Sequence, residues 1–246
     1  GRFQLGDNGI KPLELAVEAA EATGTPIMAH LGPGIDLPEV LRTLRPGDII
    51  THCYHDKGDD IFGDGETILP AVWEARERGI LFDVGHGGGS FAFDTARRAL
   101  AQDFVSDVIS TDLHCASLED PVMSLPETAS KLLNLGVPLT DVVRQCTTAP
   151  AASIGRSDEL GTLREGTIAD LAVFDCQEGE FEFRDIRDVR LVGDRSLVPS
   201  LTVRSGTVYD PLELAAERAA DRQRAMRMKA LVNGDIDKFL QGGTDP

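Results

Sequence analysis

The chain has 246 residues, of which 41% are hydrophobic and 26% charged, a composition typical of folded domains and not of disordered, collagenous or coiled-coil chains. Lys and Arg total 24 against 41 Asp and Glu, so the net charge of −17 would repel a nucleic-acid backbone. No segment approaches the ~20 apolar residues that a membrane helix needs, and the start lacks a signal-peptide layout. The four cysteines lie far apart without a Cys-x-x-Cys pair, so we expect reduced thiols and a cytoplasmic protein.

Strands and helices alternate along the first part of the chain. Short apolar runs that end in a polar residue indicate strands, and amphipathic segments bounded by Pro or Gly indicate helices. On these signals we predict strands at 26–29, 48–51, 80–84 and 105–111, and helices at 12–23, 38–44, 66–78, 93–101, 124–135 and 140–148. This alternation is typical of βα units around a parallel sheet, so we predict an α/β domain over residues 1–155.

The sequence pattern changes after residue 155. Three short alternating runs, at 169–175, 188–194 and 197–210, predict a small antiparallel sheet, so we place a second domain at 156–210. Residues 211–246 are rich in charge, with Ala, Leu and Met at helical spacing. They predict a C-terminal helical tail that packs one face on the body of the protein.

Polar side chains with metal-binding chemistry stand at the ends of the predicted strands. His30, His52 and His86 each close a separate strand, and Asp112 and His114 follow the next one. Active sites of parallel βα folds lie at the carboxyl ends of strands, so we expect these residues to converge. We predict His30 and His52 as metal ligands and Asp112 as an oxygen ligand and general base. The alternatives are hydrogen-bonded loop histidines and an aspartate that caps the next helix.

A glycine-rich run, GHGGGSF at 85–91, follows the third predicted strand. It does not fit a dinucleotide-binding loop, because Ser90 stands where the last glycine is required. We predict that backbone N–H groups near Gly87 approach a substrate oxygen and that His86 polarises the carbonyl or binds a carboxylate. A tight strand-to-helix turn is the alternative. His114 is expected either to face the same site or to fix its own loop.

Three neighbouring features receive no catalytic role. His55 is expected to be an exposed loop histidine, and Cys53 and Cys115 are expected to be buried inert thiols, because adjacent residues of an extended strand face opposite sides. The acidic run at 56–66 lacks the spacing of a calcium loop and predicts a mobile, solvated lid.

Together these motifs resemble one enzyme superfamily. The strings MAHLG, THCYH, FDVGHGGGSF, STDLH, TTAPAASIG and GTLREGTIADLAVFD, in this order, resemble the amidohydrolase superfamily and especially its deacetylase branch, which includes dihydroorotase-like and D-aminoacylase-like proteins. The resemblance implies a (β/α)8 TIM-type barrel in which His30 and His52 bind one metal while Asp112 binds another and shuttles the proton. It also implies cleavage of an amide or ester in a small molecule by a metal-activated water, with one or two zinc ions as cofactor.

The chain also departs from the family pattern. The His-x-His pair of the first barrel strand and the bridging lysine of the fourth are absent, so the resemblance implies the second half of the barrel, strands 5–8, followed by part of a small β-sandwich. We expect the N-terminal half of the barrel, in the same or a separate chain, to cover the open strand edges and restore activity. From the start at Gly1 without Met we expect a processed, tagged or excerpted product. A deaminase on the same scaffold, a non-catalytic fragment and a homo-oligomer stay open.

Overall fold

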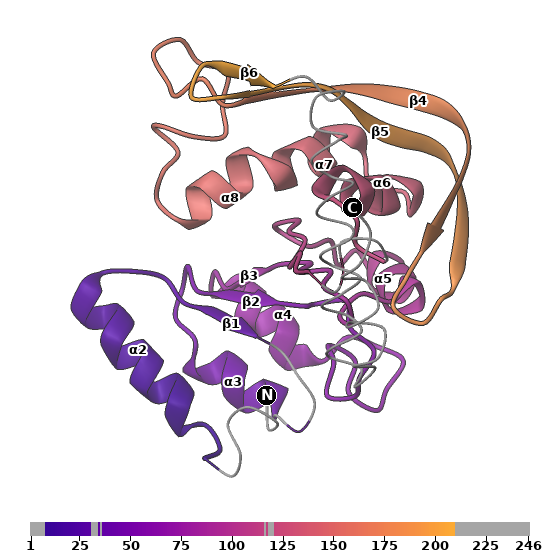
Figure 1. The fold of residues 1–246 in the computed structure, drawn as a ribbon. Coiled ribbons are helices and arrows are strands. Elements are labelled where there is room, and N and C mark those ends of the chain that lie inside the picture. The colour runs from indigo at the N-terminus through magenta and orange to yellow at the C-terminus, as the bar shows by residue number, and fades with distance from the viewer. Residues whose placement is uncertain (1–7, 31–33, 35, 116, 118–120, 210–246) are drawn as a thin grey trace, which may run out of the picture.

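The computed structural model describes residues 8–30, 34, 36–115, 117 and 121–209. In this part the chain forms a parallel sheet with helices around it and a separate antiparallel sheet, as Figure 1 shows. The predicted α/β class is confirmed, whereas the predicted helix at 211–246 lies outside the described residues. None of the described helices is long and apolar enough to cross a membrane.

Three short strands pair in parallel, each with the next along the chain: β1 (Met28–His30), β2 (Ile49–Thr51) and β3 (Leu81–Phe82). In the register of the first pair, His30 stands opposite Thr51. A single parallel bridge between Asp83 and Val108 extends the sheet to a fourth segment. The carboxyl ends of all four segments therefore meet at one edge, which we call the carboxyl edge.

The fourth predicted strand, at 105–111, is much reduced. The segment runs beside β3 through scattered hydrogen bonds, and only the bridge at Val108 has strand geometry. One cause is the side chain of Asp107, because its Oδ2 accepts from the N–H of Phe82 at 2.8 Å. This side-chain contact takes the place of a regular backbone pair.

Four helices alternate with the strands: α2 (Lys11–Thr23), α3 (Leu37–Thr43), α4 (Pro70–Glu77) and α5 (Phe93–Leu100). The first three carry proline in the first turn, where its fixed φ suits the helix and its missing N–H costs nothing. Helix α2 ends at Gly24, whose φ of 66° is left-handed. Helix α4 begins at Pro70, later than the predicted residue 66.

The hydrophobic core fills the space between the parallel sheet and these helices. Ile50, Phe82, Phe91 and Phe104 are all fully buried there. The ring of Phe104 meets the ring of Phe82 edge-on at a centroid distance of 5.1 Å and that of Trp73 at 5.4 Å. Burial of each large apolar side chain contributes about 1.5–3 kcal/mol to stability, so this cluster stabilises the parallel sheet.

Three more helices follow: α6 (Leu125–Asn134), α7 (Leu139–Cys146) and α8 (Thr148–Ser153). Ser124 caps α6, because its Oγ accepts from the N–H of Glu127 at 3.2 Å. The single helix predicted at 140–148 is in fact divided between α7 and α8. The break lies at Thr147, whose φ of −130° and ψ of −85° are not helical.

The antiparallel sheet differs from the prediction of three short strands. It contains two long strands and a short one, in chain order: β4 (Leu171–Arg184), β5 (Arg190–Arg204) and β6 (Thr207–Tyr209). The predicted run at 188–194 and the first part of that at 197–210 join into β5, because β-bulges absorb the irregular positions, and the end of the second run forms β6. The β4–β5 ribbon arches over α6 and α7 (Figure 1), and Ser130 Oγ of α6 accepts from the N–H of Leu197 at 2.9 Å.

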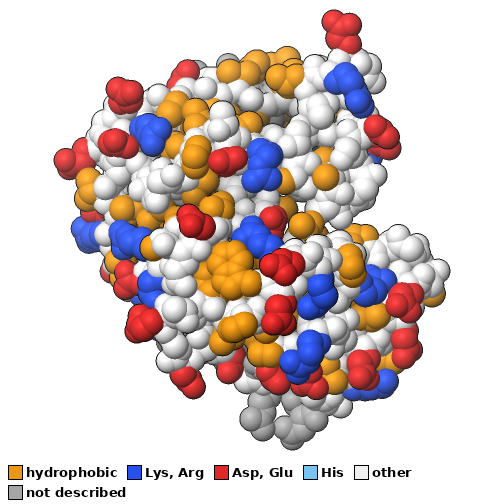
Figure 2. All heavy atoms as spheres, turned by 180° about the vertical axis from the view of Figure 1, so that it is seen from behind, with side chains coloured by type: hydrophobic (Ala, Val, Ile, Leu, Met, Phe, Trp, Pro, Cys, Tyr) orange, Lys and Arg blue, Asp and Glu red, His pale blue; other side chains and the backbone are white. Residues whose placement is uncertain are grey.

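Much of the ribbon faces outward. Nearly all of β4 is exposed, including Val173 and Phe174, and Val192 and Val208 of the neighbouring strands are 61% and 60% exposed. Figure 2 shows further apolar side chains in patches on the surface. Exposed apolar strands of this kind normally pack against another layer. The predicted domain boundary at residue 155 stays a prediction.

Candidate functional site

The carboxyl edge brings together the residues expected to bind metal. His30 is the last residue of β1, and His52 directly follows β2. The Nδ1 atom of His30 lies 2.7 Å from the Nε2 atom of His52, and their rings meet edge-on at a centroid distance of 4.3 Å. The Oδ2 atom of Asp112 lies 4.0 Å from the same Nε2 atom. Two strand ends and the segment after Val108 therefore contribute one cluster of two imidazoles and a carboxylate.

The orientation of His52 is set by the loop after β3. Its Nδ1 lies 2.5 Å from the carbonyl oxygen of Gly85, so Nδ1 carries the proton and donates it to that oxygen. The lone pair of Nε2 then points toward His30 and Asp112. A carbonyl that fixes the far nitrogen in this way is a common partner of metal-binding histidines.

Both histidines have the chemistry of neutral ligands. Burial lowers the pKa of His52, and burial followed by the neighbouring His52 lowers the pKa of His30. Neutral imidazole is the form that binds a divalent metal. His52 is 2% exposed, whereas the Asp112 side chain is 53% exposed and open to a reacting water.

The donor set fits a divalent cation but is incomplete. Across the described ranges, no three His, Cys, Asp or Glu side chains are arranged to hold a metal ion. The two facing ring nitrogens supply two donors, and a catalytic zinc site generally uses three protein ligands. In the part of the chain that the structure describes, the cluster thus offers two nitrogen donors, with the Asp112 carboxylate 4.0 Å from one of them.

The backbone is strained where these side chains are presented. His52 has a φ of 70° and Asp112 a φ of 45°, both in the left-handed region that non-glycine residues seldom adopt. Such conformations cost about 1–3 kcal/mol each and persist where the surroundings enforce them, often at functional sites. Two of the three expected ligands therefore stand at backbone positions that the surrounding structure must enforce.

Two glycines of the loop after β3 are required by close packing against the cluster. A Cβ atom on Gly85 would lie 2.0 Å from Thr51 Oγ1 and 2.8 Å from His52 Nδ1. On Gly87 it would lie 2.6 Å from Asp112 Oδ2. Both have positive φ angles, so any larger residue would be strained as well.

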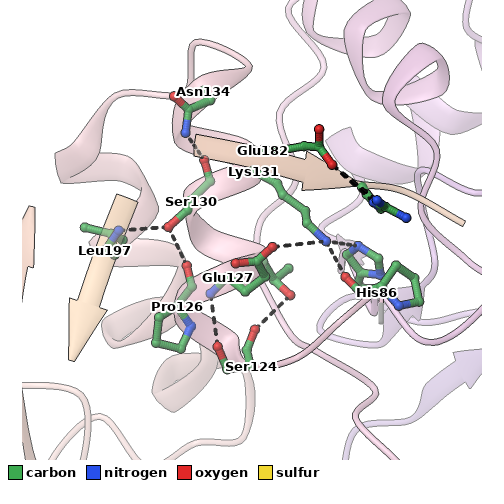
Figure 3. Close-up of polar contacts among 12 residues, drawn as sticks. His86, Ser124, Pro126, Glu127, Ser130, Lys131, Asn134, Glu182 and Leu197 are labelled. Atoms are coloured by element: carbon green, nitrogen blue, oxygen red, sulfur yellow. Dashed lines mark hydrogen bonds and ion pairs between the residues drawn. The ribbon is translucent and has the colours of Figure 1, made fainter. Parts of the chain in front are cut away.

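His86 lies beside this cluster but turns away from it. The side chain is fully buried and stacks on Phe91 at a centroid distance of 4.7 Å. Its Nδ1 lies 2.9 Å from Gly87 O and its Nε2 lies 3.1 Å from the ammonium of Lys131, as Figure 3 shows for the second contact. Because both ring nitrogens have protein partners, the predicted contact with substrate would require His86 to move, and that role stays a prediction.

The remaining predicted substrate residue, His114, lies on the other side of the glycine loop. It is exposed, and its Nε2 would lie 3.6 Å from a Cβ atom on Gly88. Its backbone N–H donates to Ser117 Oγ at 3.2 Å. The ring therefore borders the loop, which agrees with either role predicted for it.

Three predictions about nearby residues are wrong. His55 is buried, not exposed, and its Nε2 has no hydrogen-bond partner in the described part of the structure. Cys115 is exposed, since the chain after Asp112 is not an extended strand, whereas Cys53 is buried as expected. The acidic run at 56–66 is no solvated lid: its Ile61 and Phe62 belong to the core.

Sequence reasoning missed two buried charged residues at the site. Asp83 Oδ2 accepts from Thr51 Oγ1 at 2.6 Å and from Ser110 Oγ at 2.7 Å, which ties three strand ends together under the cluster. Burial raises the pKa of Asp83. The only sequence signal was an aspartate inside an apolar run, FDVG. Lys131, the second residue, had no signal, because it reads as an ordinary helix lysine.

A cavity of about 390 Å³ opens at the opposite, amino edge of the sheet. Its lining comes from the ends of α2 and α8 and from the loop before β2, including Pro26, Arg45, Asp48 and Ile154. At the right of Figure 2 the surface is notched between the upper and lower parts of the molecule. No metal-binding histidine lines this cavity, so it is not a rival for the candidate site.

Several known proteins resemble this chain over most of its length. The model of the amidohydrolase family matches residues 92–208. The chain is 35% identical over 215 residues to a deacetylase of Enterococcus faecalis, covering 85% of this chain and 58% of the relative. It is also similar to the crystal structure of an adenine deaminase (TM-score 0.80, 34% identity, 83% of this chain and 56% of the other). A dihydroorotase structure gives a TM-score of 0.72 at 33% identity, with 83% and 54% covered.

The chain thus spans little more than half the length of each of these proteins. The family match at residues 92–208 includes Asp112 and His114 but not His30, His52 or the glycine run at 85–91. The resemblance to the amidohydrolase superfamily, which the sequence motifs indicated, is confirmed. Residues 92–208 carry an amidohydrolase family domain, and most of the chain is similar to proteins of that superfamily.

Proposed function

We propose that this chain carries part of the active site of a metal-dependent hydrolase of the deacetylase type, which cleaves an amide or ester bond in a small molecule. The observation that carries the proposal is the meeting of His30 Nδ1 and His52 Nε2 at 2.7 Å, with Asp112 Oδ2 4.0 Å away. The likeness to a deacetylase supports this reaction class.

His30 and His52 would hold a divalent metal, with zinc as the first choice and one or two ions in the complete site. Such an ion supplies Lewis acidity and lowers the pKa of a bound water toward neutrality. Asp112 is the proposed general base: its exposed carboxylate accepts the proton of the attacking water and passes it to the leaving group. Its Oδ2 lies 4.0 Å from His52 Nε2, close enough to reach a water at the cluster.

The glycine loop would stabilise negative charge that develops on the substrate oxygen. In the described part of the chain, the N–H groups of Gly88 and Gly89 donate to no acceptor, whereas that of Gly87 donates to Thr111 O at 2.8 Å. Free N–H groups beside a reacting carbonyl are the usual parts of an oxyanion hole. His114 borders the same loop and is the proposed contact for the rest of the substrate.

The complete enzyme would contain this chain together with the N-terminal half of a (β/α)8 barrel, on the same or a separate chain. β1 is an edge strand of the described sheet, and Met28 on it is 55% exposed. The exposed β4–β5 ribbon would likewise become part of a small β-sandwich. A cytoplasmic location and a homo-oligomer belong to the same proposal.

A deaminase on the same scaffold is the second candidate. The likeness to an adenine deaminase, at a TM-score of 0.80, favours it. Both reactions use an activated water and a proton shuttle, so the residues proposed above would serve either one. The difference lies in the substrate carbon that is attacked.

The test compares the isolated chain and the complete enzyme, each with added zinc. We expect the complete enzyme to hold stoichiometric metal and to hydrolyse members of a panel of N-acetyl amino acids and acetyl esters. We expect the isolated chain to bind metal poorly and to be inactive. Release of ammonia from adenine by an activated water, with no cleavage of the N-acetyl amino acids or acetyl esters, would establish the deaminase instead. If the complete protein binds no metal, both candidate functions are wrong, and the remaining alternative is that this chain is a non-catalytic fragment.

A further inference from the structure

Lys131 is a lysine with no exposed surface. It lies on α6, and its side chain is 0% exposed. The Nζ atom lies 3.1 Å from His86 Nε2 and 3.9 Å from Glu127 Oε1, and it also donates to the carbonyl oxygen of Pro121. Figure 3 shows these contacts converging on the ammonium. A buried ammonium is costly to desolvate, and apolar residues of similar size often serve stability as well or better.

The chemistry of the ammonium decides the protonation of His86. A lysine ammonium has three donors and no acceptor, so the His86 Nε2 atom that faces it must offer a lone pair. The imidazole then carries its proton on Nδ1. Burial, followed by the charge of Lys131, lowers the pKa of His86 to about 3, so the ring is neutral near pH 7.

The proton on Nδ1 fixes the glycine loop. It is donated to the carbonyl oxygen of Gly87 at 2.9 Å, while the N–H of Gly87 donates to Thr111 O at 2.8 Å. Gly87 is thereby held on both sides. It is also the residue on which a Cβ atom would lie 2.6 Å from Asp112 Oδ2. A continuous set of contacts therefore runs from Lys131 through His86 and Gly87 to Asp112.

We propose that Lys131 is a positioning residue, which fixes the Nδ1–H tautomer of His86 and through it the place of Gly87 against Asp112. In this set of contacts Lys131 acts on Asp112 through His86 and Gly87. The inference rests on the proposed function in one respect, namely that the position of Asp112 matters for turnover. Its structural part, the tautomer of His86, does not depend on any activity.

The first test is nuclear magnetic resonance of the complete enzyme, labelled with ¹⁵N at histidine, at pH 7. We expect the two ring nitrogens of His86 to show the pattern of a neutral imidazole protonated on Nδ1, with Lys131 intact. A signal assigned to His86 with the proton on Nε2, or with both nitrogens protonated, overturns the proposal. This measurement needs no variant, so it decides the question even if substitutions at position 131 prevent folding.

The second test is Lys131→Met, which keeps much of the side-chain length but removes all three donors. We expect kcat to fall by about 10- to 10²-fold, the cost of small misplacements of catalytic groups, with KM and metal content within about 2-fold of wild type. We also expect the His86 signal to lose its single tautomer. Lys11→Met, at an exposed lysine, is the control and should change neither readout.

A folded Lys131→Met enzyme with wild-type kcat overturns the proposal. The proposal is also overturned if metal content and kcat fall and KM rises together while the tautomer of His86 stays unchanged. That pattern indicates general destabilisation of the protein. If wild type shows the Nδ1–H tautomer but no substrate is turned over, the proposed function fails while the tautomer assignment stands.

Discussion

The two edges of the parallel sheet differ in how their polar groups are paired. At the amino edge, Asp48 accepts hydrogen bonds from the backbone of Ile27 and from Arg45, and the Arg45 guanidinium also reaches Thr25 O at 3.0 Å. At the carboxyl edge, His30 and His52 direct ring nitrogens at each other, beside a carboxylate on a strained backbone.

This difference separates stability from function. The paired network at the amino edge closes the loop before β2 and leaves no reactive group, although the cavity of about 390 Å³ lies there. At the carboxyl edge, polar side chains face one another on a strained backbone, an arrangement common at active sites. We therefore expect substitutions at the carboxyl edge to lower activity strongly. Substitutions at the amino edge should instead lower the free energy of unfolding.

The largest effect is expected from His52→Ala in the complete enzyme. We expect metal affinity to fall by more than about 10²-fold, since loss of an outer partner of a ligand alone typically costs 10- to 100-fold. His30→Ala should act in the same direction. The measurement is metal content by mass spectrometry after dialysis. His114→Ala is the control and should retain its metal; unchanged stoichiometry in both ligand variants would show that the cluster does not bind metal.

Asp112→Asn should lower kcat by at least about 10²-fold, because loss of a general base typically costs 10²- to 10⁴-fold. The amide keeps the shape of the side chain but cannot accept the proton of the attacking water. Steady-state kinetics with circular dichroism as a folding check measures this. Asp94→Asn, at an exposed aspartate, should be neutral. Near-normal turnover of Asp112→Asn would return Asp112 to the role of a helix cap.

Gly87→Ala should lower kcat by about 10- to 10²-fold, because the new methyl group displaces the carboxylate of Asp112. Gly58→Ala is a matched control, since Gly58 also has a positive φ but nothing within 4 Å of the new Cβ atom. The comparison isolates the clash from the backbone strain. Equal effects of the two substitutions on kcat would mean that contact with Asp112 is not what requires glycine at position 87.

Asp48→Ala should act on stability alone, and it is the smallest expected effect on activity. We expect a loss of about 1–3 kcal/mol in the free energy of unfolding, the penalty for buried donors left without an acceptor. The value of kcat should stay within about 2-fold of wild type. Asp141→Ala, in an exposed pair with Arg144, should cost at most about 0.5 kcal/mol. A loss of turnover without loss of stability at Asp48 would break the contrast between the edges.

The same residue predicts the pH dependence of the amino edge. Burial raises the pKa of Asp48, but hydrogen bonds from Arg45 and Ile27 outweigh it, so the net pKa is lowered. The stability that Asp48 contributes is therefore present above its unfolded pKa and lost as the pH falls through its folded pKa. Urea denaturation at several acidic pH values should show a smaller pH slope in Asp48→Ala than in wild type.

The sequence by itself determined the alternation of elements and the edge at which chemistry is placed. Proline at helix starts, glycine after helix ends and short apolar runs are local signals, so α2 and β1 to β3 lie close to where they are predicted. His30 and His52 close successive parallel strands, and that topology alone requires them to be neighbours. The meeting of these residues with Asp112 was predictable for this reason.

The tertiary structure decided the partners of each polar atom. Whether residues 188–204 form one strand or two depends on bulges and on contacts with α6, such as that of Ser130 with Leu197. His86 and Lys131 are 45 positions apart in the chain, and no local pattern links them. Burial of His55 likewise depends on how distant segments pack. Hydrogen bonds of this kind join residues far apart in sequence, so they are settled only once the chain is folded.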